Sequence, residues 1–133
     1  MSLLEKLKQK SGVSEFISRL FSLGVQSHIF HLQVKGKGSF AIHMALNDVY
    51  QTVPGIIDSI VEAYQGKYGI IVNYKLEQPV NFTDKQQVIM YLNSLHEYID
   101  NNRTVFTDSD ILNTIDELKS LLKSTLYKLS NLE

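Results

Sequence analysis

Residues 27–66 read SHIFHLQVKGKGSFAIHMALNDVYQTVPGIIDSIVEAYQG, and this stretch decides the fold that we predict for the chain. Two runs with the apolar spacing of amphipathic helices flank the sequence Gly-Lys-Gly at residues 36–38, which is typical of a turn. His31 lies five residues before this turn, and His43 lies five residues after it. If the runs form two antiparallel helices, the two imidazoles lie at about the same height above the turn.

An acidic pair follows further along the second run. Asp58 and Glu62 are spaced i, i+4, so they share one face of a helix. Asp58 comes fifteen residues after His43, which corresponds to about 22 Å along a straight helix. Because metal–ligand bonds measure about 2 Å, the histidines and the carboxylates of one chain cannot bind the same ion. A partner chain related by a two-fold axis can bring its carboxylates beside these histidines, and such a dimer contains two equivalent sites.

The spacing of these residues resembles the signature of the Dps-like proteins, the miniferritins of the ferritin-like superfamily. The second histidine follows the first by twelve residues, and the acidic residues follow the second histidine by fifteen and nineteen. The resemblance covers about forty of the 133 residues and also includes His28, Val34, Gly36, Phe40 and Tyr50. It implies a ferroxidase centre shared across a dimer interface, without catalytic residues beyond the metal ligands His31, His43, Asp58 and Glu62.

The same resemblance implies the chemistry of the site. Members of the family oxidise Fe(II), often with hydrogen peroxide, and store the iron in a shell of twelve subunits, which protects against oxidative stress. Imidazole and carboxylate ligands suit Fe(II), Mn(II) and Zn(II) alike, so the choice of iron rests on the resemblance. A homodimer and a dodecamer both remain open, because the chain is short for the family and its third helix is trimmed.

Two positions depart from the family pattern. Leu32 stands where the family usually has Trp, which changes packing more than metal ligation. Asn47 stands where the family usually has a carboxylate, four residues after His43. A neutral amide is a weaker ligand than a carboxylate, and the adjacent Asp48 points about 100° away around the helix. Asn47 therefore favours an alternative function, in which the chain is a ferritin-like metal-binding or structural protein without efficient ferroxidase activity.

Composition limits the class of protein. With 133 residues, 44% hydrophobic and 20% charged, the chain fits one globular domain over residues 1–133. The net charge of −1, with three lysines in residues 1–12 interpreted as a solvated helix end, predicts weak or no DNA binding. Because cysteine is absent, disulfides and thiolate metal sites are impossible. No long apolar run and no signal peptide occur, so we expect a cytoplasmic protein without membrane contact.

Apolar spacing over the whole chain predicts an all-α four-helix bundle, and the resemblance implies that this bundle is ferritin-like. The expected helices start at Val13, Ser39, Thr83 and Thr107. Gly66 is expected just after the second helix, and Thr83 with Gln86 forms a capping box for the third. Residues 67–82 form a long crossover between the second and third helices, which run parallel in this fold.

Two alternatives stay open along this chain. Pro54 removes one backbone hydrogen bond and either kinks the second helix or splits it, which would turn the acidic face away from the site. Residues 70–74 read Ile-Ile-Val-Asn-Tyr and fit a short strand as well as a crossover. His96 is expected at the surface, and the sequence has no Glu-x-x-His pair to support a di-iron centre within one chain.

Overall fold

The structure is a computed structural model that describes residues 1–133, and it contains four α-helices and no strand. The helices are α1 (Leu3–Gln33), α2 (Ser39–Tyr68), α3 (Lys85–Asn102) and α4 (Ser109–Asn131), with a short 3-10 helix η1 (Arg103–Val105) between the last two. The all-α prediction is confirmed, and the alternative of a strand at residues 70–74 is wrong.

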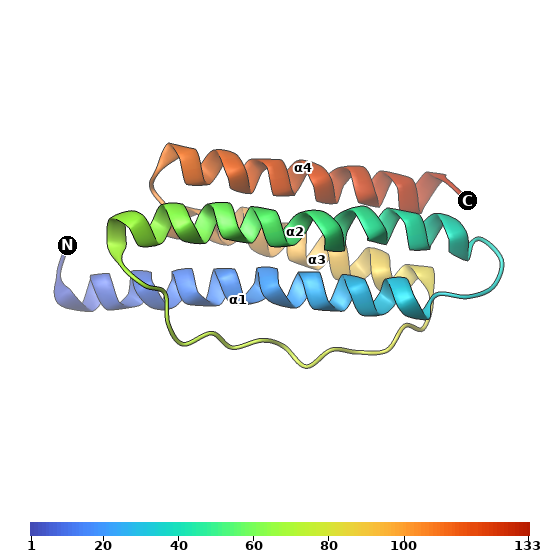
Figure 1. Ribbon diagram of the computed structural model, residues 1–133, viewed down its shortest axis with the longest axis horizontal. Coiled ribbons are helices and arrows are strands. Elements are labelled where there is room, and N and C mark those ends of the chain that lie inside the picture. Colours follow the sequence, from blue (N-terminus) through green and yellow to red (C-terminus); the bar gives the residue numbers. More distant parts are fainter.

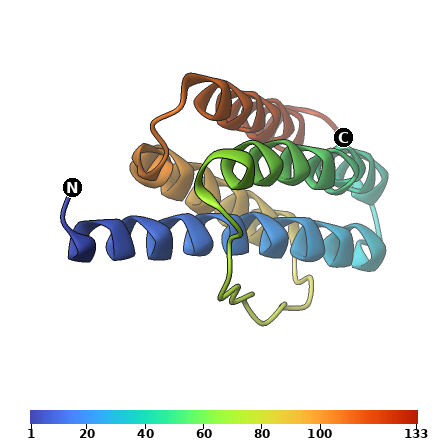
Figure 2. The same ribbon diagram turned by 60° about the vertical axis from the view of Figure 1, so that its left-hand side comes forward.

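The four helices lie side by side along one long axis (Figure 1). The chain runs forward in α1, back in α2, back again in α3 and forward in α4. α1 packs most extensively on α2, and α2 packs on α4, while α3 lies against α4 and α1. Figure 2 shows the helices grouped around a common interior. The α1–α2 pair, which carries the predicted metal ligands, therefore has the most extensive contact of the bundle.

Apolar side chains from every helix fill the interior. Fully buried examples are Phe16, Leu46, Leu92 and Leu122, one from each of the four helices. Burial of one such side chain contributes about 1.5–3 kcal/mol to folding. α2 lies between α1 and α4, so it buries apolar residues on more than one side. None of the four helices combines the length and the unbroken apolar character needed to cross a bilayer.

α1 begins earlier than the sequence predicted, at Leu3 rather than Val13. The Ser2 hydroxyl caps this helix by accepting a hydrogen bond from the Glu5 backbone N–H at 3.1 Å. This is a Ser-x-x-Glu capping pattern, which the prediction overlooked because it followed the apolar spacing of the later residues. Residues 3–8 are all exposed, so the first part of α1 lies outside the core.

The ends of α2 and α3 differ from the prediction by less than one helical turn. α2 ends at Tyr68, and Gly69 follows it with a φ of 97°, so the glycine after the helix is Gly69 rather than Gly66. α3 is capped by Asp84, which accepts a hydrogen bond from the Gln87 N–H at 2.8 Å. The predicted capping box was therefore one residue early, while the apolar faces of both helices are where the sequence placed them.

α2 passes through Pro54 without a break. Proline lacks a backbone N–H, so one hydrogen bond of the helix is missing at this point. Val53 and Ile57 are buried on either side of it, and their packing holds both halves of the helix against the core. The interpretation of a split helix is therefore wrong, and His43 and Asp58 lie fifteen residues apart on one continuous helix.

Residues 69–84 link α2 to α3 without helix or strand and run along α1 (Figure 1). Side chains at every fourth position of α1 bond to the backbone of this link. The Ser14 hydroxyl donates to Val72 O at 2.8 Å, the Lys75 and Glu77 N–H groups donate to Ser18 and Ser22 at 2.9 Å, and the Gln26 amide bonds to both Val80 N–H and Val80 O. The link therefore obtains from α1 the hydrogen bonds that a strand obtains from a neighbouring strand.

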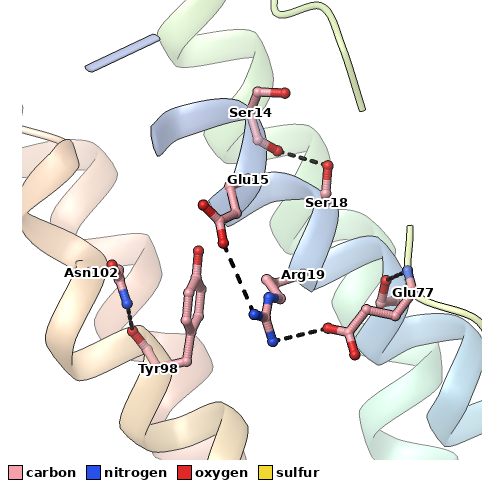
Figure 3. A network of polar contacts seen from close by, with 8 residues as sticks. Ser14, Glu15, Ser18, Arg19, Glu77, Tyr98 and Asn102 are labelled. Atoms are coloured by element: carbon pink, nitrogen blue, oxygen red, sulfur yellow. Dashed lines mark hydrogen bonds and ion pairs between the residues drawn. The ribbon is translucent and has the colours of Figure 1, made fainter. Parts of the chain in front are cut away.

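An arginine ties the link to two helices (Figure 3). The Arg19 guanidinium on α1 lies 3.0 Å from the Glu77 carboxylate of the link and 4.0 Å from the Glu15 carboxylate. It also lies 4.7 Å from the centre of the Tyr98 ring on α3. Burial is the main cause that raises the pKa of Tyr98 to about 12, with Glu15 acting in the same direction and Arg19 opposing it. Tyr98 is therefore a neutral phenol at physiological pH, and Arg19 lies over an uncharged ring.

Replacing Ser18 and Ser22 by Ala should loosen the link without unfolding the bundle. Each substitution leaves one backbone N–H of the link, at Lys75 or Glu77, without its partner, and we expect a loss of about 1 kcal/mol per site. Hydrogen exchange measured by NMR should be faster at these two amides. Ser94→Ala, at an exposed position of α3, is the control. Unchanged exchange at both amides in the double variant would contradict these hydrogen bonds.

Candidate metal site on α1 and α2

The turn between α1 and α2 brings two histidines together. Gly36 and Gly38 adopt φ values of 95° and 78°, a left-handed conformation that glycine adopts without steric cost. The chain thereby reverses within a short loop, and α1 and α2 run antiparallel. His31 and His43 consequently lie side by side, with ring centroids 3.6 Å apart. The prediction that they lie at the same height above the turn is confirmed.

The two imidazoles hold each other in a reciprocal arrangement. Their rings stack with an angle of 20° between the planes. His31 Nδ1 lies 2.8 Å from the backbone oxygen of His43, and His43 Nδ1 lies 2.9 Å from the backbone oxygen of His31. His31 is buried, with 6% of its surface exposed, whereas His43 is half-buried. The pair joins the two helices and fixes the orientation of both rings.

These hydrogen bonds determine which nitrogen of each ring is free. A carbonyl oxygen only accepts, so each Nδ1 carries a proton and donates it. In the neutral imidazole Nε2 then has no proton, and its lone pair is available to a metal ion. Neither Nε2 of His31 or His43 bonds to another group of the chain. Metal-ligating histidines in proteins commonly have this arrangement, in which a carbonyl or carboxylate holds the second ring nitrogen.

Three further rings surround the histidine pair. Tyr50 on α2 lies 4.8 Å from His31, and it stacks on His28 at 4.0 Å with the two planes only 3° apart. Phe40 lies 6.5 Å from His43. The exposed His28 therefore packs against the site through Tyr50. Of the three rings, Tyr50 lies nearest to the pair, and the two hydrogen bonds to backbone oxygens hold the imidazoles in place.

The two carboxylates lie elsewhere on the same helix. Asp58 and Glu62 are exposed on α2, and Asp58 is about 22 Å along the helix from His43 at about 1.5 Å per residue. Neither carboxylate forms an ion pair. No group of three or more His, Asp or Glu side chains of one chain is placed to hold a metal ion. One chain therefore brings together His31 and His43 but not Asp58 and Glu62.

Asn47 lies one helical turn from His43 and is half-buried. Its side-chain oxygen accepts a hydrogen bond from Gln51 Nε2 at 3.1 Å, so its only side-chain acceptor already has a partner. Asp48 does not replace the missing carboxylate, because it forms an ion pair with Lys128 of α4 at 3.3 Å. The side chain of Asp48 therefore faces α4 rather than the histidine pair.

An exposed apolar surface covers α1 and α2 beside the candidate site. Phe21, Val25 and Leu32 on α1 are 37%, 43% and 68% exposed. With His28 they form one apolar stripe along the helix, and sequence reasoning missed this stripe although the spacing of the four residues predicts it. The stripe continues into a shallow concave surface lined by side chains of both helices, Phe21, Gly24, Val25, His28, Tyr50, Val53, Pro54 and Ile57.

The fourth histidine, His96 on α3, is more buried than predicted. Its side chain is only 18% exposed, so the prediction of a surface histidine is wrong. Its Nδ1 lies 3.7 Å from Asp100, which also forms an ion pair with Lys119 of α4. The packing of α3 against α4 covers this ring. His96 therefore belongs to a contact between α3 and α4 and takes no part in the candidate site.

The tautomers of His31 and His43 provide a test that needs no metal. We expect both residues to carry the proton on Nδ1 at mildly alkaline pH, because each Nδ1 donates to a carbonyl oxygen. Long-range proton–nitrogen NMR spectra distinguish the tautomers, since protonated and unprotonated ring nitrogens resonate at different shifts. His28, whose ring forms no hydrogen bond, is the internal comparison. A proton on Nε2 of either residue of the pair would show that the reciprocal arrangement is wrong.

Comparison with known proteins finds one family whose model covers the candidate site. No curated protein and no solved structure matches the chain. Residues 31–129 match the model of the Family of unknown function (DUF5856), and this range contains His31, His43, Asp58 and Glu62. Because the match extends over most of the chain, the protein belongs to the Family of unknown function (DUF5856).

Proposed function

We propose that the protein binds and oxidises Fe(II) at a site shared across a two-fold dimer interface, as do the Dps-like proteins that it resembles. The observation that carries the proposal is the reciprocal histidine pair. His31 and His43 present two fixed Nε2 lone pairs that have no partner within the chain. In the proposed dimer a second chain supplies Asp58 and Glu62 to these imidazoles.

The residues fit a divalent transition metal ion. Two neutral imidazoles and two carboxylates provide nitrogen and oxygen donors of the kind that Fe(II), Mn(II) and Zn(II) accept. Asp58 and Glu62 are exposed and have no ion pair, so they can bind one ion without losing an existing ionic contact. Like charges one helical turn apart repel each other, and a bound cation removes this repulsion.

The shared site requires two chains in antiparallel orientation. An isologous interface buries the same surface of both chains. The exposed apolar stripe on α1, with its concave continuation, is the surface that we assign to this interface. The order of helix directions, forward, back, back and forward, supports a ferritin-like bundle, in which residues 69–84 would be the crossover. The dimer is the smallest assembly that the proposal needs, and a shell of twelve subunits would be built from such dimers.

Iron is the substrate in the proposed reaction, and each Fe(II) gives up one electron. Hydrogen peroxide accepts two electrons and two protons and yields two water molecules, so one peroxide converts two Fe(II) ions to Fe(III). Two carboxylates stabilise the higher charge of Fe(III) more than that of Fe(II), which favours oxidation. Storage of iron and removal of peroxide follow as the roles of the protein under oxidative stress.

Asn47 supports a second candidate function, that of a ferritin-like protein which binds a metal ion without efficient oxidation. Its amide oxygen is neutral and already accepts a hydrogen bond from Gln51. Complete reduction of peroxide needs two electrons, and a site with one firmly bound Fe(II) supplies only one. Iron uptake at increasing ratios of iron to protein distinguishes the two functions. Continued turnover supports oxidation, and a fixed low stoichiometry supports binding alone.

Mixing complementary variants tests the shared site. One variant lacks the imidazoles (His31→Ala, His43→Ala), and the other lacks the carboxylates (Asp58→Ala, Glu62→Ala). Each homodimer should bind no metal, whereas each heterodimer should contain one intact site and one site without ligands. An equal mixture should recover about a quarter of the wild-type sites in anaerobic Zn(II) calorimetry, because half of the dimers are heterodimers.

The control for this experiment removes two exposed carboxylates of α4, Asp110→Ala and Glu117→Ala, and should bind metal normally. Circular dichroism checks that each variant folds, and native mass spectrometry measures the fraction of heterodimers. A mixture that contains heterodimers but recovers no binding would overturn the shared site. Full binding by the carboxylate variant alone would also overturn it, since the imidazoles of one chain would then suffice.

Replacing Asn47 by Asp tests whether the neutral amide of Asn47 is what weakens the binding of a second metal ion. The new carboxylate lies one turn from His43, so a second metal ion should bind at least about tenfold more tightly and Fe(II) oxidation should become faster. Asn93→Asp is the control, because it makes the same change at an exposed position of α3. Anaerobic calorimetry measures the stoichiometry. Two equally tight ions per site in the unmodified protein would contradict the prediction.

A further inference from the structure

Residues 3–10, the first part of α1, form a helical arm that extends past the bundle (Figures 1 and 2). Residues 1–8 are all exposed. The first side chain of α1 that bonds to another element is Gln9, whose Nε2 donates to Val105 O at 3.1 Å, and the first buried residue is Val13. The helical arm is therefore attached to the bundle only at its far end, and its own surface has no packing partner.

Three leucines form a line along the helical arm. Leu3, Leu4 and Leu7 are 74%, 61% and 55% exposed. At about 100° per residue they cover an arc of about 100° around the helix axis. Gln9 lies on the side that meets the bundle, about 160° around the helix from Leu7. The leucines therefore face solvent on the side opposite to the bundle.

Three lysines accompany the leucines, namely Lys6, Lys8 and Lys10. Lys8 comes four residues after Leu4, and Lys10 comes seven residues after Leu3, so these two lysines border the apolar arc on its two edges. None of the three forms an ion pair. The arm contains a single acidic residue, so it is basic in a chain whose net charge is −1.

We propose that the helical arm docks on the surface of anionic lipid bilayers. The arm lies in the plane of the membrane with its leucines toward the lipid. The leucines enter the boundary between headgroups and acyl chains, and the lysines on either side reach the lipid phosphates. The charge of the lysines complements that of the lipid, and the leucines lose their contact with water. A nucleic acid pairs with the lysines but leaves the leucines in water, so it accounts for only half of this surface.

The proposal departs from the expectation of no membrane contact that the sequence suggested. That expectation rested on the absence of a long apolar run, which a membrane-spanning helix requires. An interfacial helix instead requires a narrow apolar line with basic residues beside it, and it lies in the plane of the membrane. The start of α1 at Leu3 is what places the leucines on one side of a helix.

Sedimentation with lipid vesicles tests the proposal on the full chain. Phosphatidylcholine vesicles that contain phosphatidylserine should bind the protein at about 0.1 M salt, and pure phosphatidylcholine vesicles should bind it much more weakly. Replacing the three lysines by Gln should weaken binding about a hundredfold, because each lysine contributes about a factor of five near an anionic surface. Leu3→Gln with Leu7→Gln should weaken binding at least about tenfold, and glutamine retains helix propensity.

Matched controls carry the same changes at exposed positions elsewhere, Lys35→Gln with Lys37→Gln and Lys85→Gln, and Ile70→Gln with Met90→Gln. Both controls should bind vesicles as the unmodified protein does. Failure to bind phosphatidylserine vesicles, or an equal loss in the controls, would overturn the proposal. A leucine variant that binds anionic vesicles as tightly as the unmodified protein would also overturn it. Equally tight binding to duplex DNA would then identify the arm as a general polyanion site.

Discussion

The length of α2 is the constraint on which the proposed site depends. A helix advances about 1.5 Å per residue, so the interval from His43 to Asp58 keeps its length for as long as α2 stays helical. Pro54 lies inside this interval, and packing of the residues beside it keeps the helix continuous. The imidazoles and carboxylates of one chain are thereby kept apart. The proposed chemistry thus depends on assembly, because in the proposal the imidazoles of one chain meet the carboxylates of another only in a dimer.

α1 presents three different surfaces. One surface is apolar and packs in the interior of the bundle, as Phe16 and Leu20 do. A second surface is polar but buried, since the link of residues 69–84 covers Ser18 and Ser22. The third surface is the exposed apolar stripe beside the histidine pair. The buried polar surface explains why the apolar periodicity of α1 is less regular than that of a helix with one core-facing side.

Local sequence signals predicted the four helices and the first turn, whereas contacts between residues far apart in the sequence determine the path of the link. Apolar spacing predicted four helices, and the glycines of the first turn predicted the pairing of His31 with His43. The start of α3 was misplaced because Thr83 and Asp84 are both good capping residues, and spacing cannot rank them. The path of the link was not predictable, because it depends on hydrogen bonds to α1 residues far away in the sequence. The roles of Asp58 and Glu62 stay a prediction, since they involve a second chain.

The hydrogen bonds between α1 and the link have a consequence for how this segment can change in length. Four helical residues advance about 6 Å and two extended residues advance about 6.6 Å, so the two repeats nearly match. Successive serines, Ser18 and Ser22, therefore meet alternate link residues, Lys75 and Glu77. The two serines, one helical turn apart on α1, therefore fix which link residues lie opposite them. An insertion of one residue between Lys75 and Glu77 would turn one of these two N–H groups away from its serine, because only alternate residues of an extended chain face the same side.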